Sequence, residues 1–152
     1  MGNSYNHILI PLDGSELAET ALDEAVSLAT ACGAAITLIH VILNPADHVI
    51  GLDTQHPIYL DQQWASQKAP GQDYLNNIRR RIATDGLTIN TAVELGAAAQ
   101  TIIDYAEQHP VDLIVMATHG RSGLQQFVLG GTAGRVMRRA NVSVLLVRAH
   151  QA

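Results

Sequence analysis

The chain has 152 residues and a formal net charge of −5; 47% of its residues are hydrophobic and 15% are charged. This length suits one domain with a buried core, the composition excludes a disordered chain, and the acidic total argues against a general nucleic-acid binder. The chain has no apolar run of about 20 residues, no signal peptide at its start and a single cysteine, so we expect one cytoplasmic domain over residues 1–152, without a membrane or nucleic-acid partner.

The first part of the chain predicts a strand, a helix and a second strand. Residues 7–12 form a short apolar run, and the turn Asp13-Gly14-Ser15 follows it. Ser15 is a typical helix cap, and apolar residues recur at helical spacing from there until Gly33. Residues 35–41 are apolar again and predict a strand.

The middle of the chain predicts a loop, two helices and an edge strand. Residues 44–70 contain three prolines and predict a long irregular loop. Helical spacing predicts a helix over residues 72–85 and another over 98–108, which ends before Pro110. Apolar and polar residues alternate over residues 89–95, a pattern typical of an edge strand.

The last part of the chain completes an α/β pattern. We expect a strand over residues 113–116, a loop with four glycines over 118–131, a helix over 132–140 and a strand over 142–147. Apolar strands that alternate with helices predict one open parallel five-stranded sheet with helices on both faces. Right-handed crossovers favour the strand order 3-2-1-4-5.

This order makes the first and fourth strands neighbours, with their following helices on opposite faces. Open α/β sheets bind ligands at such a switch point, here between the loops 11–15 and 117–131. Glycine lets backbone amides approach an anion, and the helix after Gly131 would present its N-terminus to a phosphate. Asp13 could accept hydrogen bonds from a ribose or help hold a metal ion. A mobile surface loop, with glycines that only make turns, is the alternative.

The charges are distributed unevenly. Residues 1–112 contain all 14 acidic residues, whereas residues 113–152 contain five arginines and no acid. These arginines either form a solvated helix face or mark an anion site to which Arg121 or Arg135 adds charge. The chain lacks the G-x-x-x-x-G-K-[ST] pattern of P-loop proteins and the G-x-G-x-x-G pattern of a common dinucleotide site.

Several blocks of the sequence resemble the universal stress protein family. They are residues 8–15, 38–41, 112–123, 129–130 and 142–147. The resemblance covers nearly the whole chain and is weakest over 44–70. It implies a Rossmann-like fold of the adenine nucleotide alpha hydrolase type, and a homodimer paired through the last strand, 142–147. Pairing would cover an apolar sheet edge, which is otherwise prone to aggregation.

One group within this family binds ATP through Gly-x2-Gly-x9-Gly-[Ser/Thr] after the fourth strand, and the other group lacks the motif. Gly120 and Gly130 keep the nine-residue spacing, but Ala117 replaces the first glycine. Gly131 stands at the hydroxyl position, with Thr132 one residue later. The match is therefore partial, and we expect ATP binding because the glycine amides remain.

The resemblance also implies a role for each matching position. Asp13 would contact the ribose or a metal ion, and Ala117 would lie beside the ribose. The adenine pocket would be lined by Pro11, Leu12, Val41 and Met116. The phosphates would be surrounded by Gly120, Arg121, Gly130, Gly131 and Thr132. Mg²⁺ would accompany ATP, with its protein ligands unassigned.

Three functions compete at this point. The first is a homodimeric stress-response or signalling protein in which ATP changes a surface for an unidentified protein partner. The second is a dimeric interaction module that has lost nucleotide binding. The third is a nucleotidyltransferase or ATP-dependent ligase, which would need an H-x-G-H type motif where Asp13-Gly14-Ser15 stands. We favour the first, with no catalytic residue and at most slow ATP hydrolysis.

Overall fold

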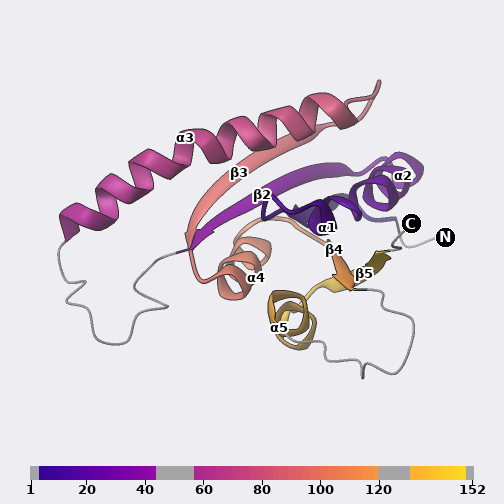
Figure 1. The fold of residues 1–152 in the computed structure, drawn as a ribbon. Coiled ribbons are helices and arrows are strands. Elements are labelled where there is room, and N and C mark those ends of the chain that lie inside the picture. The colour runs from indigo at the N-terminus through magenta and orange to yellow at the C-terminus, as the bar shows by residue number, and fades with distance from the viewer. Residues whose placement is uncertain (1–3, 44–56, 120–130, 150–152) are drawn as a thin grey trace.

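Five parallel strands form the centre of the protein (Figure 1). The computed structural model describes residues 4–43, 57–119 and 131–149. The strands are β1 (His7–Pro11), β2 (Ala35–Leu43), β3 (Ile89–Gly96), β4 (Leu113–His119) and β5 (Ser143–Ala149). Their order is β3-β2-β1-β4-β5, which confirms the predicted fold class, the predicted strand order and the edge position of β3.

Helices cover both faces of this sheet (Figure 1). They are α1 (Glu16–Glu19), α2 (Leu22–Cys32), α3 (Pro57–Ile82), α4 (Ala98–Gln108) and α5 (Gly131–Arg139). One core cluster lies under α2 and α3, and a second lies under α4 and α5. Alternate residues of β1 belong to different clusters: Ile8 and Ile10 pack in the first, and Leu9 packs in the second. Both faces of the central strands are buried, which explains the apolar runs of β1 and β4.

The helix predicted after Ser15 is divided into two. The Ser15 hydroxyl caps α1 by accepting from the Ala18 amide at 3.1 Å, as the sequence predicts. Thr20 then ends α1, and its hydroxyl donates to the Leu17 carbonyl at 2.6 Å. Such local side-chain bonds compete with helix continuation. Gly33, with φ of +70°, ends α2 in the predicted place.

The long loop predicted over residues 44–70 is wrong from Pro57 onward, because α3 begins there and continues to Ile82. Pro57 occupies the first helical position, where a missing N–H costs nothing. Pro70 lies inside the helix and removes one backbone hydrogen bond, but its surroundings are exposed and water can reach the freed carbonyl. Residues 44–56 lie outside the described residues.

Two boundaries near the predicted glycine loop also differ from expectation. β4 continues to His119, so Ala117 and Thr118 belong to a strand rather than to a loop. Pairing with β5 extends it, with Ala117 opposite Val147. The last helix begins at Gly131, one residue earlier than predicted. None of the helices in the described ranges has both the length and the apolar composition needed to cross a bilayer.

Candidate functional site

The carboxyl ends of β1 and β4 lie side by side at the centre of the sheet. The two strands pair directly, with Ile8 opposite Leu113. The chain leaves β1 toward α1 and α2 over one face, and it reaches α5 on the other face after β4. This is the switch point predicted from the sequence, where open α/β sheets bind ligands.

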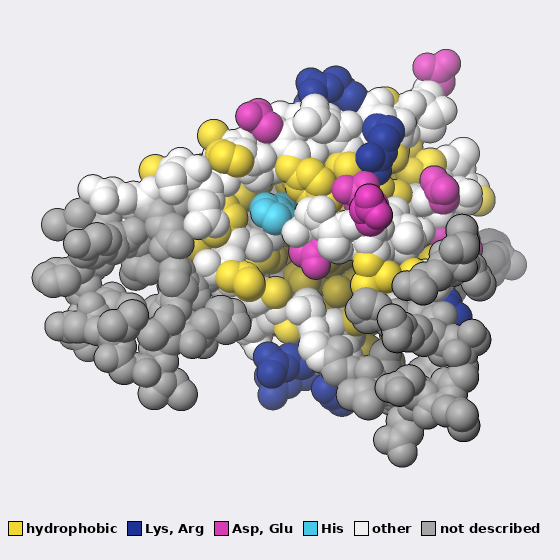
Figure 2. All heavy atoms as spheres, viewed as in Figure 1, with side chains coloured by type: hydrophobic (Ala, Val, Ile, Leu, Met, Phe, Trp, Pro, Cys, Tyr) yellow, Lys and Arg dark blue, Asp and Glu magenta, His cyan; other side chains and the backbone are white. Residues whose placement is uncertain are grey.

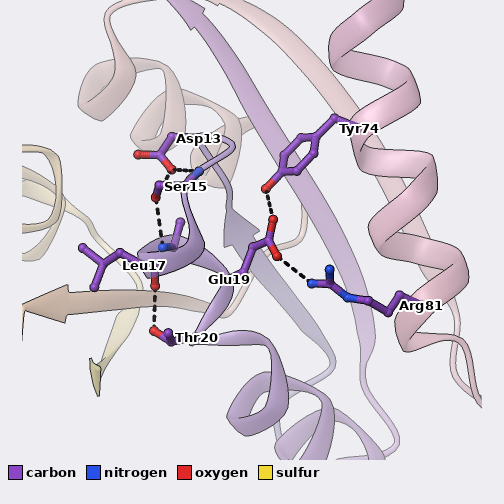
Figure 3. A network of polar contacts seen from close by, with 8 residues as sticks. Asp13, Ser15, Leu17, Glu19, Thr20, Tyr74 and Arg81 are labelled. Carbon is purple, nitrogen blue, oxygen red and sulfur yellow. Dashed lines mark hydrogen bonds and ion pairs between the residues drawn. The ribbon is translucent and has the colours of Figure 1, made fainter. Parts of the chain in front are cut away.

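The loop after β1 holds Asp13 in a fixed, exposed position (Figure 3). Oδ1 of Asp13 accepts from the Ser15 amide at 2.9 Å and from the Ser15 hydroxyl at 2.5 Å. Gly14 between them has φ of +87°, a conformation that favours glycine. Ahead of the loop, the Leu12 amide donates to the Ile39 carbonyl at 2.8 Å. The carboxylate is thus presented to solvent by a loop ordered on both sides.

A hollow of about 420 Å³ opens on the α4 and α5 side of the same sheet edge. The end of β2, the start of α4 and the exposed face of α5 form its walls. The lining residues are Leu43, Ala97, Ala98, Ala99, Gln100, Ile103, Thr132, Arg135 and Arg139. The described residues of this lining contribute apolar walls, one hydroxyl, one amide and two guanidinium groups.

The electrostatics of this hollow favour an anion. α4 begins at Ala98 and α5 at Gly131, and neither helix has an acidic residue in its first turn. The N-terminal ends of helices carry partial positive charge. Arg135 and Arg139 are exposed and add full charges. Figure 2 shows one group of basic side chains at the α5 side of the molecule, below the acidic ones, and other basic side chains at the top over α3.

The predicted site residues are distributed over both faces of the sheet. Val41 and Met116 belong to the cluster under α4 and α5, on the side of the hollow that Thr132 lines. Leu12 is buried in the cluster on the opposite face of the sheet, and its predicted contact with the base stays a prediction. Ala117 packs against the same cluster as Leu12, and its methyl group is therefore directed away from the hollow.

The remaining predicted residues lie at strand and helix ends or outside the described part of the chain. Pro11 is half-buried and ends β1. Gly131 opens α5 with φ of +72°. Gly120, Arg121 and Gly130 lie outside the described residues, so their predicted contacts with phosphate stay predictions.

Neither the α4 wall of the hollow, with Gln100, nor Arg139 is predicted from the sequence. The sequence feature that indicates Arg139 is its spacing of four residues from Arg135, because residues at this spacing lie on one face of a helix. The signal for the α4 wall is the run of alanines at 97–99, whose small side chains leave space at a helix start.

A second polar group occupies the opposite, amino-terminal end of the sheet. His7 Nε2 lies 2.7 Å from the hydroxyl of Thr37, which is 1% exposed. The Asp112 carboxylate accepts from the backbone amides of Asn6 at 2.8 Å and His7 at 3.1 Å. Burial lowers the pKa of His7, against the opposing charge of Asp112. In the described ranges, no group of three or more His, Cys, Asp or Glu side chains is placed to hold a metal ion.

Comparisons with known proteins identify relatives of the whole chain. The model of the universal stress protein family matches residues 4–148. The universal stress protein MJ0531 of Methanocaldococcus jannaschii is 32% identical over 147 residues, which cover 96% of this chain and 84% of that protein.

Solved structures of the same kind superpose well on this chain. The structure of MJ0577 from Methanocaldococcus jannaschii has a TM-score of 0.79 at 25% identity, covering 97% of this chain and 99% of that one. UspA from Lactobacillus plantarum has a TM-score of 0.77 at 29% identity, with coverage of 97% and 100%. Two universal stress protein structures that share the fold, at 23% and 18% identity, are complexes with cAMP and, from Archaeoglobus fulgidus, with dAMP.

Proposed function

The chain belongs to the universal stress protein family, and from that premise we propose that it binds an adenine nucleotide, ATP, at the switch point between β1 and β4. The observation that carries this proposal is the hollow at the carboxyl edge of the sheet, where two helix N-termini and two arginines meet apolar walls. The cAMP and dAMP complexes show that nucleotides bind to proteins with this fold.

The residues of the site suit the parts of a nucleotide. In the proposal the base packs on the side of Val41 and Met116, and the phosphates lie at the start of α5 near Thr132 and Arg135. A guanidinium forms strong, charge-assisted hydrogen bonds with phosphate. In the proposal the Asp13 carboxylate, which is exposed after β1, contacts the ribose hydroxyls or a metal ion. Mg²⁺ is commonly bound through one or two carboxylates together with substrate phosphates, and Asp13 fits that role.

The two departures from the family motif are compatible with this proposal. The Ala117 methyl group packs away from the hollow, so it takes no space from a ligand there. Gly131 lacks a hydroxyl, but Thr132 lines the hollow and supplies one from the next position.

We further propose that the nucleotide is held rather than consumed. Within the described part of the chain, the polar side chains that line the hollow are Gln100, Thr132, Arg135 and Arg139. None of these four is a carboxylate or an imidazole, the groups that serve most often as general bases. The carboxylate that the proposal brings to the nucleotide, Asp13, is assigned to the ribose or Mg²⁺ and not to a proton transfer. A bound nucleotide would then act as a signal in a stress response, read by a protein partner.

A homodimer through β5 belongs to the same proposal. β5 is an edge strand, and its apolar residues 144–147 are only half-buried. Exposed edge strands invite pairing with another chain. Light scattering coupled to size-exclusion chromatography tests the dimer. The expected cytoplasmic location stays a prediction.

The test begins with the nucleotide itself. The purified protein is denatured, any released nucleotide is identified, and ATP with Mg²⁺ is titrated by calorimetry. We expect Asp13→Ala to weaken ATP binding by about tenfold or more, since hydrogen bonds to charged groups contribute about 1.5–3 kcal/mol. The control is Asp73→Ala, which removes an exposed carboxylate on α3. Failure to bind millimolar ATP, with no nucleotide released, would instead indicate an interaction module without a ligand.

A further inference from the structure

α3 is tied to the loop that presents Asp13 through one acidic side chain (Figure 3). Oε1 of Glu19, at the end of α1, accepts from the Tyr74 hydroxyl at 3.0 Å. Oε2 of the same carboxylate accepts from Arg81 at 2.7 Å. Tyr74 and Arg81 both belong to α3, so a single residue of α1 joins the two helices.

The two ties differ in strength. The Arg81 side chain is 57% exposed, and ion pairs at such positions contribute little because water screens them. Tyr74 is half-buried, and burial first and the Glu19 hydrogen bond second raise the pKa of its hydroxyl. A hydrogen bond with the Gly14 backbone lowers the pKa of the same hydroxyl. The Tyr74 hydroxyl therefore lies beside the loop that presents Asp13. The Tyr74 bond is therefore the stronger link.

His40 reinforces this link from β2. Its Nδ1 lies 2.8 Å from the carbonyl oxygen of Leu12, directly before Asp13. Its ring meets the Tyr74 ring edge-on, with centroids 5.7 Å apart. On α3, a Cβ added to Gly71 would lie 3.1 Å from the His40 ring, so the helix is closely packed here.

The segment from Leu12 to Thr20 needs such external support. α1 has only four residues, and a helix this short is unstable alone because nucleation is costly. The Asp13–Ser15 hydrogen bonds order the turn internally, but they do not fix it against the rest of the protein. Tyr74 and His40 contact it from α3 and β2.

We propose that Tyr74 and Glu19 are positioning residues of the nucleotide site, which hold residues 12–20 so that Asp13 meets the ligand and thereby couple ligand binding to α3. The inference rests on the proposed function. A site that is only fractionally in its competent conformation binds with reduced apparent affinity. Coupling is reciprocal, so a bound nucleotide must in turn stabilise α3 around Tyr74.

The test compares Tyr74→Phe with Tyr5→Phe. Tyr5 packs against the same core cluster, but it precedes β1 and lies at the opposite end of the sheet. Hydrogen exchange of the nucleotide-free protein measures protection over residues 12–20, and calorimetry measures ATP affinity. We expect Tyr74→Phe to accelerate exchange there and weaken ATP binding by about fivefold, the effect of one hydrogen bond. Tyr5→Phe should change neither.

Two variants of Glu19 separate positioning from simple stability. Glu19→Gln keeps an oxygen that accepts from Tyr74 and loses the ion pair, whereas Glu19→Ala loses both. We expect Glu19→Ala to match Tyr74→Phe and Glu19→Gln to recover most of the affinity. In the wild-type protein ATP should slow exchange in α3 around Tyr74, and in Tyr74→Phe it should not.

The outcomes distinguish the two proposals. Wild-type ATP binding that Tyr74→Phe leaves unchanged would overturn the positioning role alone, and so would unchanged exchange over residues 12–20. Absence of ATP binding in the wild-type protein would overturn the proposed function, and this inference with it.

Discussion

The two ends of the sheet use similar polar residues in opposite ways. At the amino end, the His7 ring bonds to the Thr37 hydroxyl, and the Asp112 carboxylate accepts from the His7 backbone amide. Thr37 is buried. At the carboxyl end, Asp13 is exposed and Arg135 lines a hollow. Polar groups with internal partners stabilise the fold, whereas those directed into a hollow are available to a ligand. Substitutions at the two ends should therefore affect different measurements.

The largest expected effect lies at the amino end. Asp112→Ala removes the acceptor of the Asn6 and His7 backbone amides, and we expect it to lower the free energy of unfolding by about 2 kcal/mol. Urea unfolding measures this loss, with Asp73→Ala as a surface control. ATP affinity should stay unchanged. A variant with normal stability and weaker ATP binding would contradict the comparison.

The next effect lies at the carboxyl end and should leave stability unchanged. Arg135 is exposed and lines the hollow. We expect Arg135→Ala to weaken ATP binding by about tenfold, since a charged hydrogen bond is lost, while adenosine binding stays the same. Calorimetry with both ligands measures this difference, and Arg79→Ala on α3 is the matched control. Equal losses for ATP and adenosine would place Arg135 away from the phosphates.

The smallest effect is a dependence of stability on pH at the amino end. Burial lowers the pKa of His7 below 6.5, so near that pH the folded protein binds fewer protons than the unfolded chain. The stabilisation is complete above pH 6.5 and is lost as the pH falls through the lowered pKa. His109 adds to the lowering and Asp112 opposes it. Urea unfolding between about pH 8 and pH 5 should show a flatter profile for His7→Gln than for the wild type; equal profiles would exclude His7 as the cause.

Local patterns predicted those elements whose signals lie within a few residues. The helix 98–108 was predicted with its observed bounds because its apolar face is regular and Pro110 follows. The sequence also located Ser15 as a cap. The start of α3 was missed because Pro57 and Pro70 indicate a loop when only neighbours in sequence are considered. The end of β4 was missed because its pairing with β5 extends it, and that partner lies far along the chain.

The candidate site was predictable to a similar degree. Asp13 lies two residues after the end of β1, so its place at the sheet edge follows from topology. The hollow was not predictable, because it depends on how the start of α4 faces α5 in space. The sequence also does not show that Leu12 and Val41 belong to different core clusters, because sequence order does not reveal which face each residue occupies at the end of its strand. Their shared role at an adenine base stays a prediction.

The left-handed backbone at Gly131 has a consequence for how this chain could change over evolution. A serine at this position would complete the family motif at its last residue, and space for its side chain exists. With φ of +72°, however, any residue with a Cβ would be strained there, by about 1 kcal/mol. A single Gly131→Ser substitution would thus lower the stability of the protein before any gain in binding. Thr132, which needs no such backbone change, offers the accessible route to a hydroxyl at the start of α5.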